Sequence, residues 1–110
     1  MVKRDFIRIG EVLSAIFRGK KLTLNKVVIF GSYAKQTQRP DSDIDLIIVS
    51  RDFRGKDLFE RVKLMSGVHN DLVDQINKPF DILYYSDQEW KAGRGLVLSA
   101  AKKEGKVIFG

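Results

Sequence analysis

The chain has 110 residues, of which 44% are hydrophobic and 31% are charged, and it contains no cysteine. This size and composition suit a single domain over residues 1–110 with one core, and they exclude disulfides and thiolate metal sites. No apolar run approaches the roughly 20 residues of a membrane-spanning helix, and the N-terminus lacks a secretory apolar segment. We therefore expect a cytoplasmic protein that does not associate with a membrane.

The net charge is +6, and the basic residues form two groups in the sequence. They are Lys3, Arg4, Arg8, Arg18, Lys20, Lys21 and Lys26 near the start, and Lys102, Lys103 and Lys106 near the end. Such a surplus can attract a triphosphate, a nucleic acid or an acidic partner. Ordinary solvated helix faces explain it equally well, so the charge alone does not predict nucleic-acid binding.

The first half of the chain predicts two helices and two apolar strands. Apolar side chains recur at helical spacing over residues 3–18, which predicts an amphipathic helix. Residues 27–30 are continuously apolar, as in a strand covered on both faces, and Gly31 ends this run. A short helix is expected over residues 32–35, and a second apolar strand over residues 44–49.

The second half continues the alternation. Residues 56–77 carry a helical apolar stripe with a break at Gly67, and residues 79–85 form a third strand. Ser86 and Glu89 have the spacing of a capping box that opens a last helix, which Gly105 ends before a short strand over residues 107–109. This order predicts an α/β fold in which helices flank a small mixed sheet.

A Gly-Ser turn follows the first strand. Gly31 lets the backbone approach a ligand closely or take a positive φ, which a residue with a Cβ resists. Ser32 would lie in the first turn of the short helix, where free backbone N–H groups attract phosphate. By itself such a turn is an ordinary helix cap, and the phosphate interpretation depends on the aspartates that follow.

Asp43 and Asp45 follow the turn, and ten residues separate Ser32 from Asp43. Side chains alternate along a strand, so both carboxylates would share one face of the sheet. Two carboxylates on one face repel unless a cation lies between them, and hard ions such as Mg²⁺ bind oxygen ligands. The alternative is a polar turn with Asp45 exposed at a sheet edge, but residues 44–49 are too apolar for a solvated edge.

These residues resemble the signature of the DNA polymerase β-type nucleotidyltransferase superfamily, in which Gly-Ser is followed at this distance by Asp-x-Asp. The short chain and the run Arg-Pro-Asp-Ser-Asp-Ile-Asp-Leu look like the minimal nucleotidyltransferases, small prokaryotic proteins often paired with a helical HEPN protein. The resemblance implies the polymerase β-like fold and a Mg²⁺ or Mn²⁺ cofactor. It also implies attack on the α-phosphate of a nucleoside triphosphate with pyrophosphate leaving.

A third carboxylate is expected on a neighbouring strand of such a site, and Asp81 is the candidate. The resemblance implies that Asp81 binds metal together with Asp43 and Asp45 and accepts the proton of the attacking hydroxyl. The alternative is a polar residue that merely opens a strand.

Lys35 and Gln36 replace the Arg-Gly of many family members. Lysine keeps a positive charge without the bidentate fork of arginine, so Lys35 is a candidate phosphate contact beside Gly31 and Ser32. The missing glycine predicts that the short helix runs a little longer. His69 has no second ligand at metal spacing and is expected at the surface or at a helix end.

The short segment after Asp81 leaves no room to hold an acceptor, which another copy or another protein must then complete. The resemblance implies a HEPN toxin whose tyrosine receives AMP from ATP, with this chain as antitoxin. One alternative is a binding module that neutralises its partner by contact. Another is a small-molecule transferase of the aminoglycoside type, which the absence of a second domain disfavours.

Overall fold

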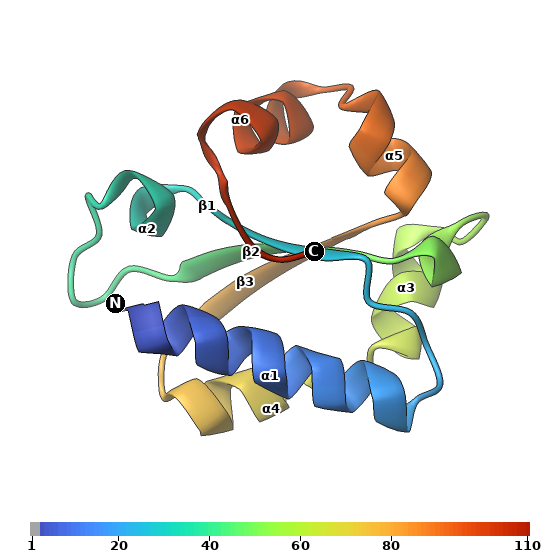
Figure 1. Ribbon diagram of the computed structural model, residues 1–110, viewed down its shortest axis with the longest axis horizontal. Coiled ribbons are helices and arrows are strands. Elements are labelled where there is room, and N and C mark those ends of the chain that lie inside the picture. The colour runs from blue at the N-terminus through green and yellow to red at the C-terminus, as the bar shows by residue number, and fades with distance from the viewer. Residues whose placement is uncertain (1–2) are drawn as a thin grey trace.

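The computed structural model describes residues 3–110, so the first two residues of the N-terminal segment lie outside the described part. Helices and strands alternate as expected (Figure 1). In chain order they are α1 (Lys3–Gly19), β1 (Lys26–Phe30), α2 (Ser32–Lys35), β2 (Ile44–Val49), the 3-10 helix η1 (Arg51–Phe53), α3 (Leu58–Leu64), α4 (Val68–Ile76), β3 (Phe80–Tyr85), α5 (Asp87–Ala92), α6 (Leu96–Glu104) and β4 (Lys106–Phe109). Within the described part, no helix has the length and apolarity needed to cross a membrane.

The strands form one mixed sheet in the order β3-β2-β1-β4. Strand β1 is antiparallel to both β2 and β4, and β2 is parallel to β3. In this register Asp45 of β2 lies opposite Phe30 of β1 and beside Asp81 of β3. The expected fold class, a small mixed sheet with flanking helices, is confirmed.

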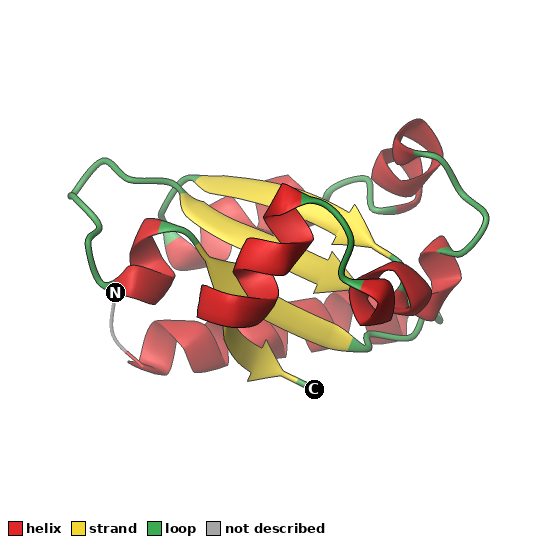
Figure 2. Cartoon of the chain, turned by 90° about the horizontal axis from the view of Figure 1, so that it is seen from above, coloured by secondary structure: helices red, strands yellow, loops and turns green. Residues whose placement is uncertain are grey.

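Both faces of the sheet are covered. Figure 1 shows α1 and α4 on one face and α5 and α6 on the other, and Figure 2 shows helices both in front of and behind the strands. Residues of β2 alternate between two cores: Ile44, Leu46 and Ile48 pack with α1 and α4, while Ile47 and Val49 pack with Leu98 of α6. This burial on both faces explains why the second strand is continuously apolar.

Glycines divide the long helical segments. The predicted break at Gly67 is confirmed, since this residue has a φ of 90° and separates α3 from α4. The single last helix was a wrong prediction: Gly93 and Gly95 have φ values of 63° and 89° and separate α5 from α6. A positive φ cannot continue a right-handed helix, and glycine adopts it without steric strain. The capping box of Ser86 and Glu89 is formed as predicted.

Candidate active site

Gly31 brings the turn after β1 against a carboxylate of the next strand. Its φ is 71° and its ψ is −147°. A Cβ placed on Gly31 would lie 2.3 Å from Oδ2 of Asp45. This position therefore requires glycine for two reasons, the positive φ and the close approach of the Asp45 side chain.

The short helix α2 begins directly after this turn, at Ser32. It ends at Lys35, because Gln36 has a φ of 59° and its N–H donates to the carbonyl of Ser32. The prediction that α2 runs longer without the family's glycine is therefore wrong. Gln36 takes the left-handed conformation that glycine usually supplies at the end of a helix.

Asp45 and Asp81 are neighbours in the sheet. Each is the second residue of its strand, and the parallel register pairs them. Paired residues of parallel strands point to the same face, here the face covered by α5 and α6, where Ile47 and Leu83 pack. Asp43 precedes β2 by one residue and is exposed, like Asp81, whereas Asp45 is partly buried.

The electrostatic environment of the cluster shifts the pKa of Asp45. Partial burial raises the pKa of its carboxyl, and the negative charges of Asp81 and Asp43 raise this pKa further. No cation of the described residues pairs with any of the three carboxylates. The described residues also contain no group of three or more His, Cys, Asp or Glu side chains that could by itself hold a metal ion.

The loop between α2 and β2 is anchored by residues that the sequence did not single out. The hydroxyl of Tyr33, a buried residue, donates to the carbonyl of Ser42 at 3.3 Å. The hydroxyl of Ser42 accepts from the backbone N–H of Arg39 at 2.8 Å. The first bond ties the residue before Asp43 to α2, and the second lies within the loop. The only sequence signal was an aromatic residue in a very short helix.

Lys35 contacts the end of α6. Its Nζ lies 3.0 Å from Oε2 of Glu104, and both side chains are about half exposed. An ion pair this exposed is weak and exchanges readily with other partners. The phosphate contact predicted for Lys35 stays a prediction. His69 lies on α4 at the surface, as expected, with its Nε2 3.0 Å from the carbonyl oxygen of Phe80.

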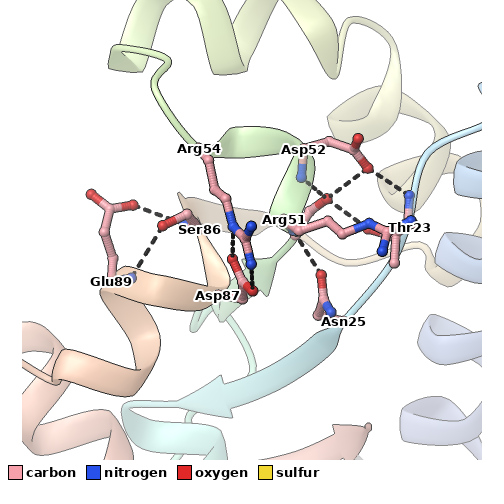
Figure 3. A network of polar contacts seen from close by, with 9 residues as sticks. Thr23, Asn25, Arg51, Asp52, Arg54, Ser86, Asp87 and Glu89 are labelled. Carbon is pink, nitrogen blue, oxygen red and sulfur yellow. Dashed lines mark hydrogen bonds and ion pairs between the residues drawn. The ribbon is translucent and has the colours of Figure 1, made fainter.

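A second polar network lies at the other end of the strands, where Ser50 and Ser86 follow β2 and β3 (Figure 3). Arg54 of the segment after η1 makes a bidentate ion pair with Asp87 of α5. The buried Ser50 hydroxyl donates to the carbonyl of Thr23 at 2.6 Å. This network fixes η1 and α5 and is separate from the carboxylates, which lie near the starts of β2 and β3.

Solved structures share this fold. A toxin–antitoxin crystal structure with AMP-PNP has a TM-score of 0.63 and 21% identity, covering 91% of this chain and 72% of that chain. A putative nucleotidyltransferase from Sulfolobus solfataricus has a TM-score of 0.60 and 18% identity, covering 93% and 78%. A mutant of the toxin–antitoxin MntA-HpeT has a TM-score of 0.61 and 18% identity, covering 93% and 72%.

Sequence comparison identifies the family. None of the curated proteins matches the chain significantly. The family model described as "Polymerase beta, Nucleotidyltransferase" matches residues 11–110, which include the turn at Gly31 and all three carboxylates. The chain therefore belongs to the polymerase β nucleotidyltransferase family.

Proposed function

We propose that this protein transfers a nucleoside monophosphate, AMP from ATP, to a hydroxyl of a partner protein in a reaction that depends on Mg²⁺ or Mn²⁺. One observation carries the proposal. The carboxylate of Asp45 lies against the Gly31 turn and beside Asp81 in the register, and no side-chain cation of the described residues neutralises the cluster. Repelling carboxylates of this kind weaken a fold unless they have a ligand to bind.

Asp43 and Asp45 are the proposed metal ligands, and Asp81 is the proposed third. Mg²⁺ is usually held by one or two carboxylates together with substrate phosphates, so the nucleotide itself would complete its coordination. This accounts for the lack of a self-sufficient three-ligand group in the described residues. When bound, the ion would neutralise charge on the triphosphate and on the carboxylates.

The turn at Gly31 and Ser32 is the proposed phosphate contact. Because Gly31 has no side chain, its backbone lies directly against the Asp45 carboxylate, which brings the turn beside a proposed metal ligand. Free N–H groups of the first turn of α2 would donate to phosphate oxygens, with the Ser32 hydroxyl as a further donor. Lys35 would reach the triphosphate after leaving Glu104.

Asp81 is the proposed general base. It is exposed, and it lies on the edge strand β3, where an acceptor can approach. The acceptor oxygen would attack the α-phosphorus, the bond from that phosphorus to the bridging oxygen of pyrophosphate would break, and the hydroxyl proton would pass to Asp81.

Structural neighbours support the choice of nucleotide and partner. One structural neighbour is a toxin–antitoxin with AMP-PNP, an ATP analogue. Another is a mutant in which two aspartates, two positions apart like Asp43 and Asp45, are replaced by glutamate. Together with the resemblance to minimal nucleotidyltransferases, these neighbours support a HEPN-like toxin as the acceptor and an antitoxin role for this chain.

Metal dependence tests the site. In calorimetry we expect ATP affinity to fall at least tenfold when EDTA replaces Mg²⁺, and equally in Asp43→Asn, because the metal joins the carboxylates to the triphosphate. Asp74→Asn, a change of an exposed aspartate on α4, is the matched control and should bind as the wild type does. Equal ATP affinity with and without metal would contradict the proposal.

Intact-mass analysis tests the transfer. The product of the neighbouring gene would be incubated with this protein, Mg²⁺ and each nucleoside triphosphate in turn. A mass gain of one or more nucleoside monophosphates, absent with Asp43→Asn, would support the transferase. An unmodified partner that binds tightly and loses its own activity would favour the alternative, a module that neutralises by contact.

A further inference from the structure

Strand β3 has an outer edge that pairs with no other strand. It lies beside β2 and runs from α4 to α5 (Figure 1). The carbonyls of Pro79 and Tyr85, at its two ends, accept hydrogen bonds from N–H groups at or next to the ends of β2. Backbone groups alternate along a strand, so three residues of β3 point theirs outward, namely Phe80, Ile82 and Tyr84.

Two side chains cap this edge and leave one residue open between them. The Nε2 of His69 lies 3.0 Å from the carbonyl oxygen of Phe80, and the guanidinium of Arg61 donates to the carbonyl of Tyr84 at 3.0 Å. Within the described residues, the N–H and the carbonyl of Ile82 have no hydrogen-bond partner. An outward N–H and carbonyl on one residue match the backbone of another extended chain.

Grooves lie on both faces of β3 beyond Ile82. One groove of about 430 Å³ is lined by Val62, His69 and Tyr84, and another of about 350 Å³ is lined by Leu83 and Tyr85. Tyr84 packs with the core under α1 and α4, whereas Leu83 and Tyr85 pack with the core under α6. Side chains of an added strand also alternate between the two faces, so successive residues would enter one groove and then the other.

Strand addition would place one foreign side chain beside Asp81. Both grooves meet β3 at residues 83–85, and Asp81 lies two residues before Leu83 on the same face. Residues paired across neighbouring strands share a face, and the strands are about 4.8 Å apart. Asp45 has this relation to Asp81 from the β2 side. A residue paired with Asp81 from the outer side would therefore hold its side chain next to both carboxylates.

We propose that the acceptor segment of the partner protein binds as a short extended strand along the outer edge of β3, with its hydroxyl residue opposite Asp81. Ile82 would pair with the backbone of this segment. Apolar side chains two and three residues from the hydroxyl would enter the grooves at Leu83 and Tyr84. The hydroxyl oxygen would bond to the α-phosphorus, pyrophosphate would leave, and the proton would pass to Asp81. This inference rests on the proposed transfer reaction.

An array of short peptides tests the chemistry and the register. Each peptide has one central Ser, Thr or Tyr and is incubated with the whole protein, Mg²⁺ and ATP, and a mass gain of one AMP is scored. We expect modified peptides to carry apolar residues both two and three positions from the hydroxyl, on the same side of it. In the best peptide, N-methylation at alternate backbone positions should lower the rate about tenfold, whereas methylation at the intervening positions should not, because only alternate N–H groups face β3.

Ile82→Pro tests the location on this protein. Proline has no N–H but is tolerated in edge strands, so the rate with the best peptide should fall about tenfold. Affinity for Mg-ATP in calorimetry should stay that of the wild type. Ile82→Val keeps the N–H and is the matched control. Circular dichroism checks that Ile82→Pro is folded, and the N-methyl series on the wild-type protein decides the proposal if it is not.

Each contrary outcome has its own meaning. An N-methyl series without a two-residue period, or equal rates for folded Ile82→Pro and the wild type, would overturn strand addition and leave the transferase in place. Modification of the whole partner protein but of no peptide would show that a short extended segment is not what is recognised. ATP binding without metal dependence would instead be a failure of the proposed function. A solution dimer that dissociates in Ile82→Pro would assign this edge to a second copy.

Discussion

Gly31 links backbone conformation to the position of a carboxylate. Gly31→Ala should destabilise the protein by about 1–2 kcal/mol, because φ is positive, and should lower ATP affinity at least tenfold, because the new methyl group displaces Asp45. Gly55→Ala is the matched control, since Gly55 has a φ of 69° but a Cβ at this position would meet no atom within 4 Å. Urea unfolding and calorimetry measure the two effects. Equal loss of ATP affinity in both variants would contradict this role.

The raised pKa of Asp45 predicts how the unfolding free energy depends on pH. Burial and the charges of Asp81 and Asp43 raise this pKa in the folded protein above its ordinary value. The native state therefore keeps a proton that the unfolded chain has lost, and the unfolding free energy falls as pH rises from the ordinary pKa through the raised one.

Asp81→Asn should therefore stabilise the protein at pH 7 in EDTA, because it removes one of the charges that oppose ionised Asp45. The gain should shrink as the pH falls below the ordinary pKa of aspartate, where Asp45 is protonated in both states. Urea unfolding across this pH range measures the difference. Asp74→Asn, a change of an exposed residue of α4, is the control. A gain independent of pH would show that the charges of the cluster do not interact.

At the scale of secondary structure, Arg61 joins three elements. From α3 its guanidinium donates to the carbonyls of Lys56 and Tyr84 and to Glu89 of α5, at 2.7 to 3.0 Å. It is buried, and it lies over the ring of Phe53. A buried cation with three acceptors is satisfied, and its removal leaves those acceptors without a partner.

Arg61→Met should lower the unfolding free energy by about 2–4 kcal/mol, since methionine fills space but donates no hydrogen bond. The control is Arg54→Met, which breaks the exposed ion pair with Asp87 shown in Figure 3 and should have a much smaller effect. Chemical denaturation of both variants gives the comparison. Equal losses of unfolding free energy would mean that the buried hydrogen bonds of Arg61 contribute no more to stability than the exposed ion pair of Arg54.

At the scale of the whole molecule, the carboxylates lie at the end of the sheet where β2 and β3 begin. Strand β3 is an edge strand, and Asp81 on it is exposed. The exposed position of Asp81 leaves the acceptor side open to solvent, and positioning two reactants contributes many powers of ten to a rate.

We therefore expect pyrophosphate release from ATP to be nearly undetectable with this chain alone. Addition of the partner that supplies the hydroxyl should raise it at least a hundredfold. A coupled pyrophosphate assay with and without that partner measures this, with Asp81→Asn as the inactive control. Rapid release by the chain alone would mean that water or a small molecule serves as the acceptor.

Local sequence determined much of the fold. The apolar stripe of α1, the two buried strands, the break at Gly67 and the capping box of Ser86 all depend on residues within one or two turns of each other, so periodicity and residue type predict them. The same locality explains the errors. Gly93 and Gly95 are visible in the sequence, but the apolar stripe around them favoured one continuous helix. Gln36 has a positive φ, which its residue type disfavours.

The sequence by itself also determined which residues are candidates for the site, because Gly-Ser and Asp-x-Asp keep their spacing within one short segment. Only the tertiary structure decided that Asp81 lies beside Asp45, that Lys35 contacts Glu104 and that Arg61 holds α5. Each of these contacts joins segments far apart in the chain. Strand register and helix packing set them through the combined burial of many side chains, which no local pattern encodes.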